Sequence, residues 1–310
     1  MSVINTNVSA TLAANAILRN DRAMGTAMER LSTGLRINSA KDDAAGLAIS
    51  TRMKAEVSGL EMAAKNANDA ISMLEVAEGA TLEISNMLIR MRELAVQSAS
   101  GTYSDTDRDA LDLEFTALKS EIDRIATNTT WNTKSILNGA NDAADQTTTV
   151  TSITVQLGSG AGETMALTFK SWNIGSSIDV AGTGIAADAS DSSNHAYGTA
   201  ALKWSGGTAG TINVDTAAAA TNAIAQLDRA IQGASAERAN YGAFMARLTH
   251  SADNLTNVAQ NTDQSRSRIE DADYAVETSE LARTQIISQA ATAMLAQANQ
   301  SKQGVLQLLQ

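Results

Sequence analysis

The sequence predicts a mainly α-helical protein: a long antiparallel helical rod or coiled coil with paired N- and C-termini, and a small β-rich outer domain inserted in the middle. Three observations lead to this fold class. The 310 residues contain no proline, the residue that breaks helix interiors because it lacks an amide donor and clashes with the preceding turn. Aromatic residues make up only 3%, which suits narrow aliphatic seams between helices. In both terminal thirds, apolar residues recur at alternating three- and four-residue spacings, as they do on helices.

Apolar spacing predicts three helices in the N-terminal part of the chain. The first ends in the polar segment RINSAKDD, and the second is expected from about residue 44 to 99. The third follows a break at 100–102, where Ser104 and Asp107 resemble a capping box. The seam residues are, helix by helix, Met24, Met28, Leu31 and Leu35; Leu74, Ala77, Thr81, Ile84, Leu88, Met91 and Ala95; and Leu111, Phe115, Leu118, Ile122 and Ile125.

The C-terminal third carries the strongest heptad pattern. Its seam residues are Ile224, Leu227, Ile231, Ala234, Tyr241, Met245, Leu248, Ala252 and Leu255. Arg238 interrupts this seam, either with its aliphatic stem along the seam and its charge at the edge, or as a polar residue that fixes register; we favour the first. Toward the end of the chain, one helical face is expected to carry Ile287, Ala291, Met294, Ala298, Val305 and Leu309.

The middle of the chain alternates in the manner of strands. Apolar residues occupy every second position at 153–157 and again at 165–169, with the turn-like stretch GSGAGE between them. These segments predict a hairpin in a small β-rich domain, with Trp172 and Trp204 as candidates for its core.

Narrow apolar stripes gain most of their stability by burial against a partner helix, so the N- and C-terminal helices must pair. The simplest arrangement returns the chain on itself. Helices within 44–128 and 218–255 then form an inner bundle, the two terminal segments form a further pair, and the middle zone lies at the far tip.

Composition excludes several classes of partner. The net charge of −11 would repel phosphate backbones, and no basic stripe with interleaved aromatic residues is present, so no nucleic acid is expected. No apolar run approaches the ~18 residues of a membrane-spanning helix. The first twenty residues lack the charged start and apolar stretch of a secretory signal peptide, so any export would need another route.

Some fragments resemble catalytic or metal sites but lack residues that such sites require. Asp105, Asp107 and Asp109 begin like a calcium loop, but the sixth position is Ala110 rather than glycine. Acidic side chains in a first helical turn interact favourably with the positive end of the helix dipole, so a helix start is the better interpretation. The chain has no cysteine and two histidines, and neither histidine stands in a nucleophile-elbow context. We expect no enzyme activity, no cofactor and no metal.

The polar segment 36–50 lies between two predicted helices. It is either a solvated linker or a joint that contacts a neighbouring subunit. Two acidic residues just before the second helix favour a joint, whose residues are Arg36, Asn38, Ser39, Lys41, Asp42 and Asp43.

Several motifs resemble the bacterial flagellin family. At the N-terminal side these are VINTN at 3–7, ERLSTGLRINSAKDDAAGLAIS at 29–50, NANDAISMLEVAEGA at 66–80 and MRELAVQSASGT at 91–102. At the other end, RIEDADYAVETSELARTQIISQAATAMLAQANQSKQGVLQLL at 268–309 is similar to the flagellin C-terminus throughout.

The resemblance implies a structural subunit that polymerises into the bacterial flagellar filament for swimming motility. Residues 1–43 and 267–310 would form an inner coiled coil, 44–140 and 218–266 a helical middle layer, and 141–217 a variable surface domain. The subunit would be exported unfolded through the flagellar type III apparatus and be secreted to the extracellular filament. Its terminal segments would be disordered in the monomer and fold on docking.

The resemblance also implies partners. These are further copies of the chain, a flagellar export chaperone, the cap and hook-associated proteins, and host Toll-like receptor 5. We expect subunit contacts at the joint residues and at Ile287, Met294, Val305 and Leu309. Arg90, Leu94 and Glu114 match the receptor-contacting residues of flagellins; alternatively, they are filament-interface residues.

Two rival functions share part of this pattern. A flagellin-like hook–filament junction protein would also have paired terminal helices, but it would match the segments 36–50 and 91–102 less closely. A coiled-coil binding module with a ligand in its outer domain would remain monomeric.

Overall fold

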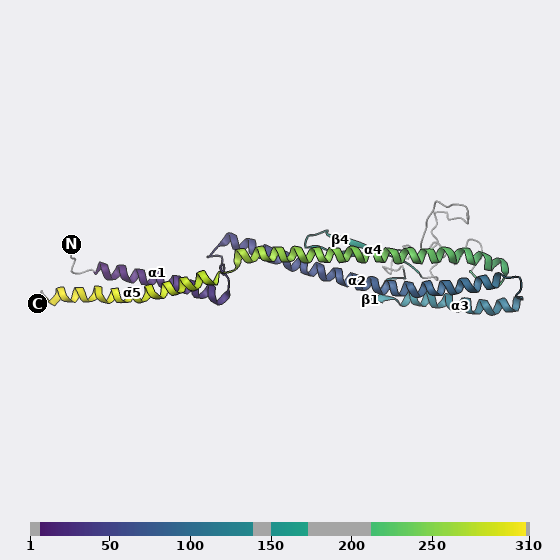
Figure 1. Ribbon diagram of the computed structural model, residues 1–310, viewed down its shortest axis with the longest axis horizontal. Coiled ribbons are helices and arrows are strands. Elements are labelled where there is room, and N and C mark those ends of the chain that lie inside the picture. Colours follow the sequence, from purple (N-terminus) through teal and green to yellow (C-terminus); the bar gives the residue numbers. More distant parts are fainter. Residues whose placement is uncertain (1–6, 139–149, 173–211, 308–310) are drawn as a thin grey trace. The chain divides into compact units, whose positions relative to one another are not determined.

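The computed structural model describes residues 7–138, 150–172 and 212–307, and the chain divides into two compact units (Figure 1). The first, here called the terminal unit, comprises residues 1–58 and 258–310. The second, the central unit, comprises residues 59–257. Long helices dominate both, so the predicted mainly α fold is confirmed.

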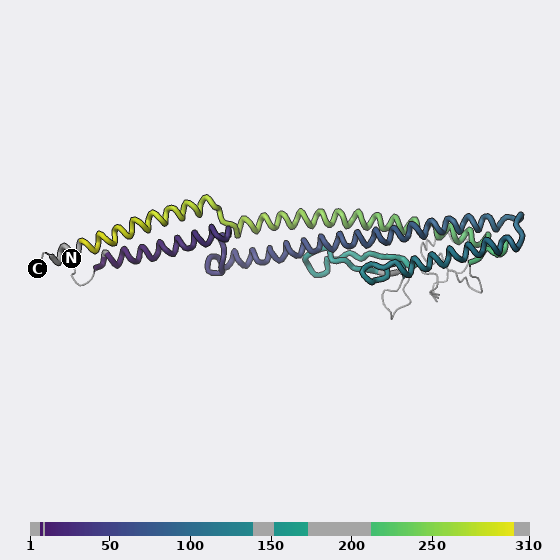
Figure 2. The backbone as a smooth tube through the Cα atoms, turned by 90° about the horizontal axis from the view of Figure 1, so that it is seen from below, coloured from purple at the N-terminus to yellow at the C-terminus, as the bar shows by residue number. Residues whose placement is uncertain are grey.

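The terminal unit is built on two paired helices, α1 (Val8–Thr33) and α5 (Tyr274–Gln307). They lie side by side in both ribbon and tube views (Figure 2). The pair is antiparallel, because the Asn7 side chain near the start of α1 donates to the carbonyl oxygen of Ala298 near the end of α5, at 3.4 Å. The predicted pairing of the two ends of the chain is confirmed.

The seam between α1 and α5 is narrow and partly polar. On α5, the side that meets α1 runs through Glu277, Thr284, Ala291 and Ala298, which are buried or half-buried at seven-residue spacing. The predicted single apolar face of α5 is therefore wrong in part. Ala291 and Ala298 lie toward α1, whereas two large apolar side chains, Ile287 (43% exposed) and Met294 (65% exposed), lie on the outside. Met28, predicted in the seam of α1, is exposed as well.

The central unit is organised around α2 (Ala44–Ala99), whose bounds match the predicted helix. Its core also draws on α3 (Asp105–Asn128) and α4 (Ala217–Glu270). Every predicted seam residue of α2 is fully buried, namely Leu74, Ala77, Thr81, Ile84, Leu88, Met91 and Ala95. The hydroxyl of Thr81 donates to the Ala77 carbonyl oxygen at 2.8 Å, which explains how a polar residue fits an apolar seam.

The start of α3 has the predicted capping box, in which the Ser104 and Asp107 side chains bond each other's backbone amides. A buried arginine that sequence reasoning missed ties down the preceding turn. Arg108 donates to the carbonyl oxygens of Ser98 (2.9 Å) and Ser100 (3.0 Å) and pairs with Asp105 (3.0 Å). The aspartates at this point therefore begin a helix.

Two hairpins complete the central unit. Strands β1 (Thr130–Trp131) and β2 (Lys134–Ser135) flank a tight turn with positive φ at both central residues, as a type I′ turn requires. Strands β3 (Val150–Gln156) and β4 (Thr164–Lys170) pair antiparallel, which confirms the predicted hairpin. Leu167, Phe169 and Trp172 are buried in the same core as the helices. Trp204 lies outside the described residues.

The buried face of α4 is wider than the predicted seam, because α4 packs against the β3–β4 hairpin as well as α2. Arg238 is half-buried and pairs with Glu78 of α2 at 3.0 Å, so its charge lies at the edge as predicted. The neighbouring Glu237 is buried, only 2% exposed. It accepts from the Lys170 amide at 3.3 Å and pairs with the Lys170 ammonium at 3.8 Å.

Candidate interaction surfaces

Residues 34–43 form a joint between α1 and α2 that is bonded to the break between α4 and α5. Helix α1 ends at Gly34, whose φ of 74° is left-handed and whose amide donates to Arg30 at 2.8 Å, an arrangement that favours glycine. Beyond it, the Arg36 amide donates to Glu270 at 2.6 Å and the Ala272 amide donates to Gly34 at 2.9 Å. The joint between α1 and α2 and the break between α4 and α5 are therefore bonded to each other.

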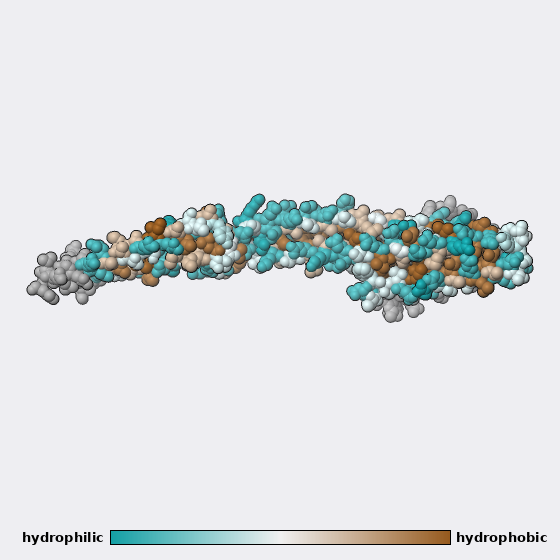
Figure 3. Space-filling view, turned by 60° about the horizontal axis from the view of Figure 1, so that its bottom comes forward, coloured by the Kyte–Doolittle hydropathy of each residue, from teal (hydrophilic) through white to brown (hydrophobic). Residues whose placement is uncertain are grey.

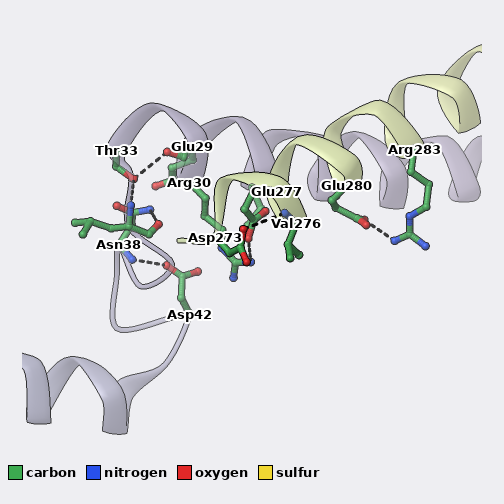
Figure 4. A network of polar contacts seen from close by, with 12 residues as sticks. Glu29, Arg30, Thr33, Asn38, Asp42, Asp273, Val276, Glu277, Glu280 and Arg283 are labelled. Carbon is green, nitrogen blue, oxygen red and sulfur yellow. Dashed lines mark hydrogen bonds and ion pairs between the residues drawn. The ribbon is translucent and has the colours of Figure 1, made fainter. Parts of the chain in front are cut away.

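The joint is folded around two acidic residues. The Asp42 carboxylate accepts from the amides of Asn38 (3.2 Å) and Ser39 (3.0 Å) and from the Ser39 hydroxyl (3.0 Å), and Figure 4 shows Asp42 and Asn38 facing each other. Asp43 caps the start of α2 by accepting from the Gly46 amide at 2.8 Å. A Cβ on Gly46 would lie 2.6 Å from Cδ1 of the buried Ile37, so a larger residue there would force the Ile37 side chain to move.

The two basic residues of the joint differ in their contacts. Arg36 is exposed, and its guanidinium donates to the carbonyl oxygen of Ile269 just before the α4–α5 break. Lys41 is exposed. The structure thus brings the predicted joint residues together in one loop and adds a partner segment, 269–272, that sequence reasoning did not find.

Hydrogen bonds from the Ser39 amide and hydroxyl lower the pKa of Asp42 below its usual value. Because the folded pKa lies below the unfolded one, Asp42 stabilises the joint above its unfolded pKa, and this stabilisation is lost as the pH falls through the folded pKa. We expect the Ser39 amide to lose protection from hydrogen exchange, corrected for intrinsic rate, as the pH falls below about 4. In Asp42→Ala, protection should already be low at neutral pH; equal protection in both proteins at neutral pH would contradict this role.

A second polar contact fastens the base of the α1–α5 pair. Arg30 near the end of α1 pairs with Glu277 in the first turn of α5 at 2.9 Å, and the Tyr274 hydroxyl donates to the Leu31 carbonyl oxygen at 3.1 Å. Figure 4 shows Arg30 and Glu277 within a network of polar contacts. Each charge lies at the helix end that its sign favours, which is the signal in the sequence that could have identified the pair.

Both helices of the terminal unit expose large apolar side chains, and Figure 3 shows hydrophobic patches on the face of this unit that it presents. Such surfaces mark sites of association in soluble proteins. Two of these side chains, Ile287 and Met294, are among the predicted contact residues; Leu309 and the side chain of Val305 lie outside the part that the structure describes. The exposed residues on α1 and α5 are Val8, Leu12, Leu18, Met28, Tyr274, Val276, Ile286, Ile287 and Met294.

On the central unit, the structure brings together two of the three residues that match receptor contacts. Arg90 of α2 pairs with Glu114 of α3 at 2.9 Å, and also with Glu93 at 2.9 Å. These side chains are about half exposed. Leu94 is buried beneath them at 1% exposure, where it packs in the core.

Within the described residues, no group of three or more His, Asp or Glu side chains is placed to hold a metal ion. No helix in the same ranges has a stretch long and apolar enough to cross a membrane. Paired long helices that carry apolar residues on their outer faces define a structural protein that associates through helix surfaces.

Comparisons with known proteins agree with this class. Residues 4–142 match the family model of the bacterial flagellin N-terminal helical region, and residues 224–309 match that of the bacterial flagellin C-terminal helical region. A flagellin of Halalkalibacterium halodurans is 39% identical over 307 residues, and polar flagellin A of Vibrio parahaemolyticus is 36% identical over 374 residues. Each alignment covers 99% of both chains. The crystal structure of Bacillus cereus flagellin is 33% identical and covers 64% of this chain and 94% of its own, with a TM-score of 0.45.

The chain belongs to the bacterial flagellin family. It is a structural subunit that polymerises into the flagellar filament, and it is exported out of the cell as a component of that filament. The family is structural rather than enzymatic. None of the matches favours a hook–filament junction protein or a ligand-binding module.

Proposed function

We propose that copies of the chain dock in the filament through two surfaces of the terminal unit: the joint at 34–43 and the outer stripe of α5. The outer stripe comprises Ile286, Ile287 and Met294. Ile287 and Met294 are seven residues apart, two helical turns, and therefore lie on one side of the helix. The observation that carries the proposal is their exposure on a helix that already meets α1 through Thr284 and Ala291.

Burial of such side chains supplies the driving force. Covering an isoleucine or methionine side chain contributes ~1.5–3 kcal/mol. In a helical polymer every subunit makes the same head-to-tail contacts, so each gain is repeated along the filament. The proposed layers are the inner coiled coil of 1–43 with 267–310, the middle layer of 44–140 with 218–266, and the surface domain of 141–217.

Replacing both outer-stripe residues by serine, Ile287→Ser with Met294→Ser, should raise the critical concentration for seeded polymerisation about 100-fold. The reason is that two apolar contacts of about 1.5 kcal/mol each are lost, and 1.4 kcal/mol corresponds to a factor of ten. Sedimentation of seeded samples measures the critical concentration. The matched control is Gln285→Ser with Thr292→Ser, an exposed polar pair on the same helix at the same spacing. Equal critical concentrations in the two double variants would refute the role of the outer stripe.

At the joint, the residues have different roles. Asn38, Asp42 and Asp43 shape the loop through the bonds described above, and Arg36 fastens it to residue 269. Lys41, which is exposed, is the residue we assign to direct contact with a neighbouring subunit. Together these side chains give each subunit a defined polar surface at the joint.

The remaining partners follow from the same surfaces. We propose that the α1–α5 pair is disordered in the exported monomer and folds when neighbouring copies cover its outer faces, so the ordering cost is met by subunit contacts. Exposed apolar side chains on both terminal helices are what an export chaperone would cover before passage through the flagellar type III apparatus. The cap and hook-associated proteins would meet the same faces at the filament ends.

Host Toll-like receptor 5 is the partner that we assign to the Arg90–Glu114 pair. Arg90→Ala should lower receptor activation in a reporter cell assay at least about tenfold, because a central arginine contact typically exceeds 1.4 kcal/mol. Leu94, buried below the pair, supports the helix packing. Arg124→Ala on α3 is the matched control, since Arg124 is also an exposed arginine in an ion pair, with Glu121. An unchanged response to Arg90→Ala would contradict the assignment of the receptor to this site.

A further inference from the structure

A polar residue occupies the middle of the seam between α1 and α5. Asn20 is 8% exposed, and its side-chain amide donates to the carbonyl oxygen of Thr284 at 2.7 Å. Thr284 is 2% exposed, and its hydroxyl donates to Leu281 within its own helix at 2.9 Å. The contact between the helices at this level is therefore made by a polar side chain against main chain.

The seven-residue pattern of α1 places Asn20 where an apolar residue would normally pack. Ile17, Met24, Ala27 and Leu31, the neighbouring positions at three- and four-residue spacing, are all apolar and at least half-buried. A single polar residue in such a seam reduces the stability of the helix pair. Replacing buried polar groups by well-packed apolar ones of similar volume often stabilises a fold.

The α1–α5 pair thus buries polar Asn20, Thr284 and Glu277 in its seam, while several large apolar side chains of both helices are exposed. A pair built this way gains little from closing on itself and more from being covered by neighbours. We infer that Asn20 lowers the stability of the isolated α1–α5 pair, so that the pair becomes ordered only when it docks against neighbouring subunits. This inference rests on the proposed function, in which the pair folds on docking.

The test compares Asn20→Leu with Asn15→Leu in the full-length monomer below the polymerising concentration. Asn15 is exposed on the same helix, so both variants gain the same helix propensity and only one changes the seam. Order is read from trypsin cleavage after Arg30, which lies near the end of α1, away from both substitutions, and tracks the open fraction of the pair. We expect cleavage of Asn20→Leu to be at least about tenfold slower than that of Asn15→Leu, and unseeded polymerisation to start sooner.

A second variant tests the opposite direction. Asp at position 20 cannot donate to a carbonyl oxygen and would leave a buried charge unpaired, so Asn20→Asp should raise the critical concentration for seeded polymerisation at least about tenfold. Equal or faster cleavage of Asn20→Leu relative to Asn15→Leu, or an unchanged critical concentration in Asn20→Asp, would overturn the role of Asn20. Slow cleavage at Arg30 in the unsubstituted monomer would instead overturn folding on docking itself, which separates the two failures.

Discussion

A chain that lacks residues 268–310 should form no filaments and yet keep a folded central unit. The deletion removes α5 and with it the outer stripe, the partner of α1, and Glu277 at the base of the pair. The buried residues of the central core all lie between Ala67 and Leu248, so the core loses none of its members. Seeded polymerisation followed by electron microscopy measures the first effect, and a helical circular-dichroism signal with a cooperative thermal transition measures the second.

Two results would contradict this expectation. Filaments of normal form from the truncated chain would show that the terminal helices are not needed for docking. Loss of the cooperative transition would show that the central unit depends on the terminal one, contrary to the separate core. A chain carrying Gln285→Ser with Thr292→Ser serves as the polymerising control, because it changes α5 without removing it.

Lys170→Ala should destabilise the central unit by about 3 kcal/mol, because it leaves the buried Glu237 carboxylate without its cation. The midpoint of urea unfolding, followed by the helical signal, measures this loss. Lys134→Ala is the matched control, since Lys134 lies exposed on the other hairpin. Adding Glu237→Gln to Lys170→Ala should recover much of the stability, because a neutral amide needs no cation. An unfolding midpoint for Lys170→Ala equal to that of Lys134→Ala would show that the ion pair does not support the hairpin.

The folds of the two units differ in how far the sequence predicts them. In α2, every seam residue that periodicity identified is buried, because this apolar face packs within the chain itself, although the buried face begins earlier, at Leu60. The β3–β4 hairpin was equally clear from alternation of apolar residues. In α5, Ile287 and Met294 share the periodicity of Ala291 and Ala298 but are exposed, whereas the two alanines are half-buried. Periodicity assumes that an apolar stripe meets a partner in the same chain, and here the seam with α1 is partly polar.

The contacts of the candidate site were predicted less completely. Residues 36–43 were expected to form a joint, and the structure folds them into one loop. Their pairing with 269–272 could not be read from the sequence, because it is made by backbone groups of segments far apart in the chain. Glu237 was missed for a related reason: only the position of Lys170 on the hairpin explains why an acidic residue is buried there.

The most direct test of the account is a cryo-electron microscopy reconstruction of filaments assembled from the purified chain, at a resolution that shows side chains. The account predicts that α1 and α5 of each subunit pair as an antiparallel coiled coil, with Ile287 and Met294 covered by helices of neighbouring copies. Filaments in which both side chains face solvent, with subunits joined through their central units alone, would contradict it.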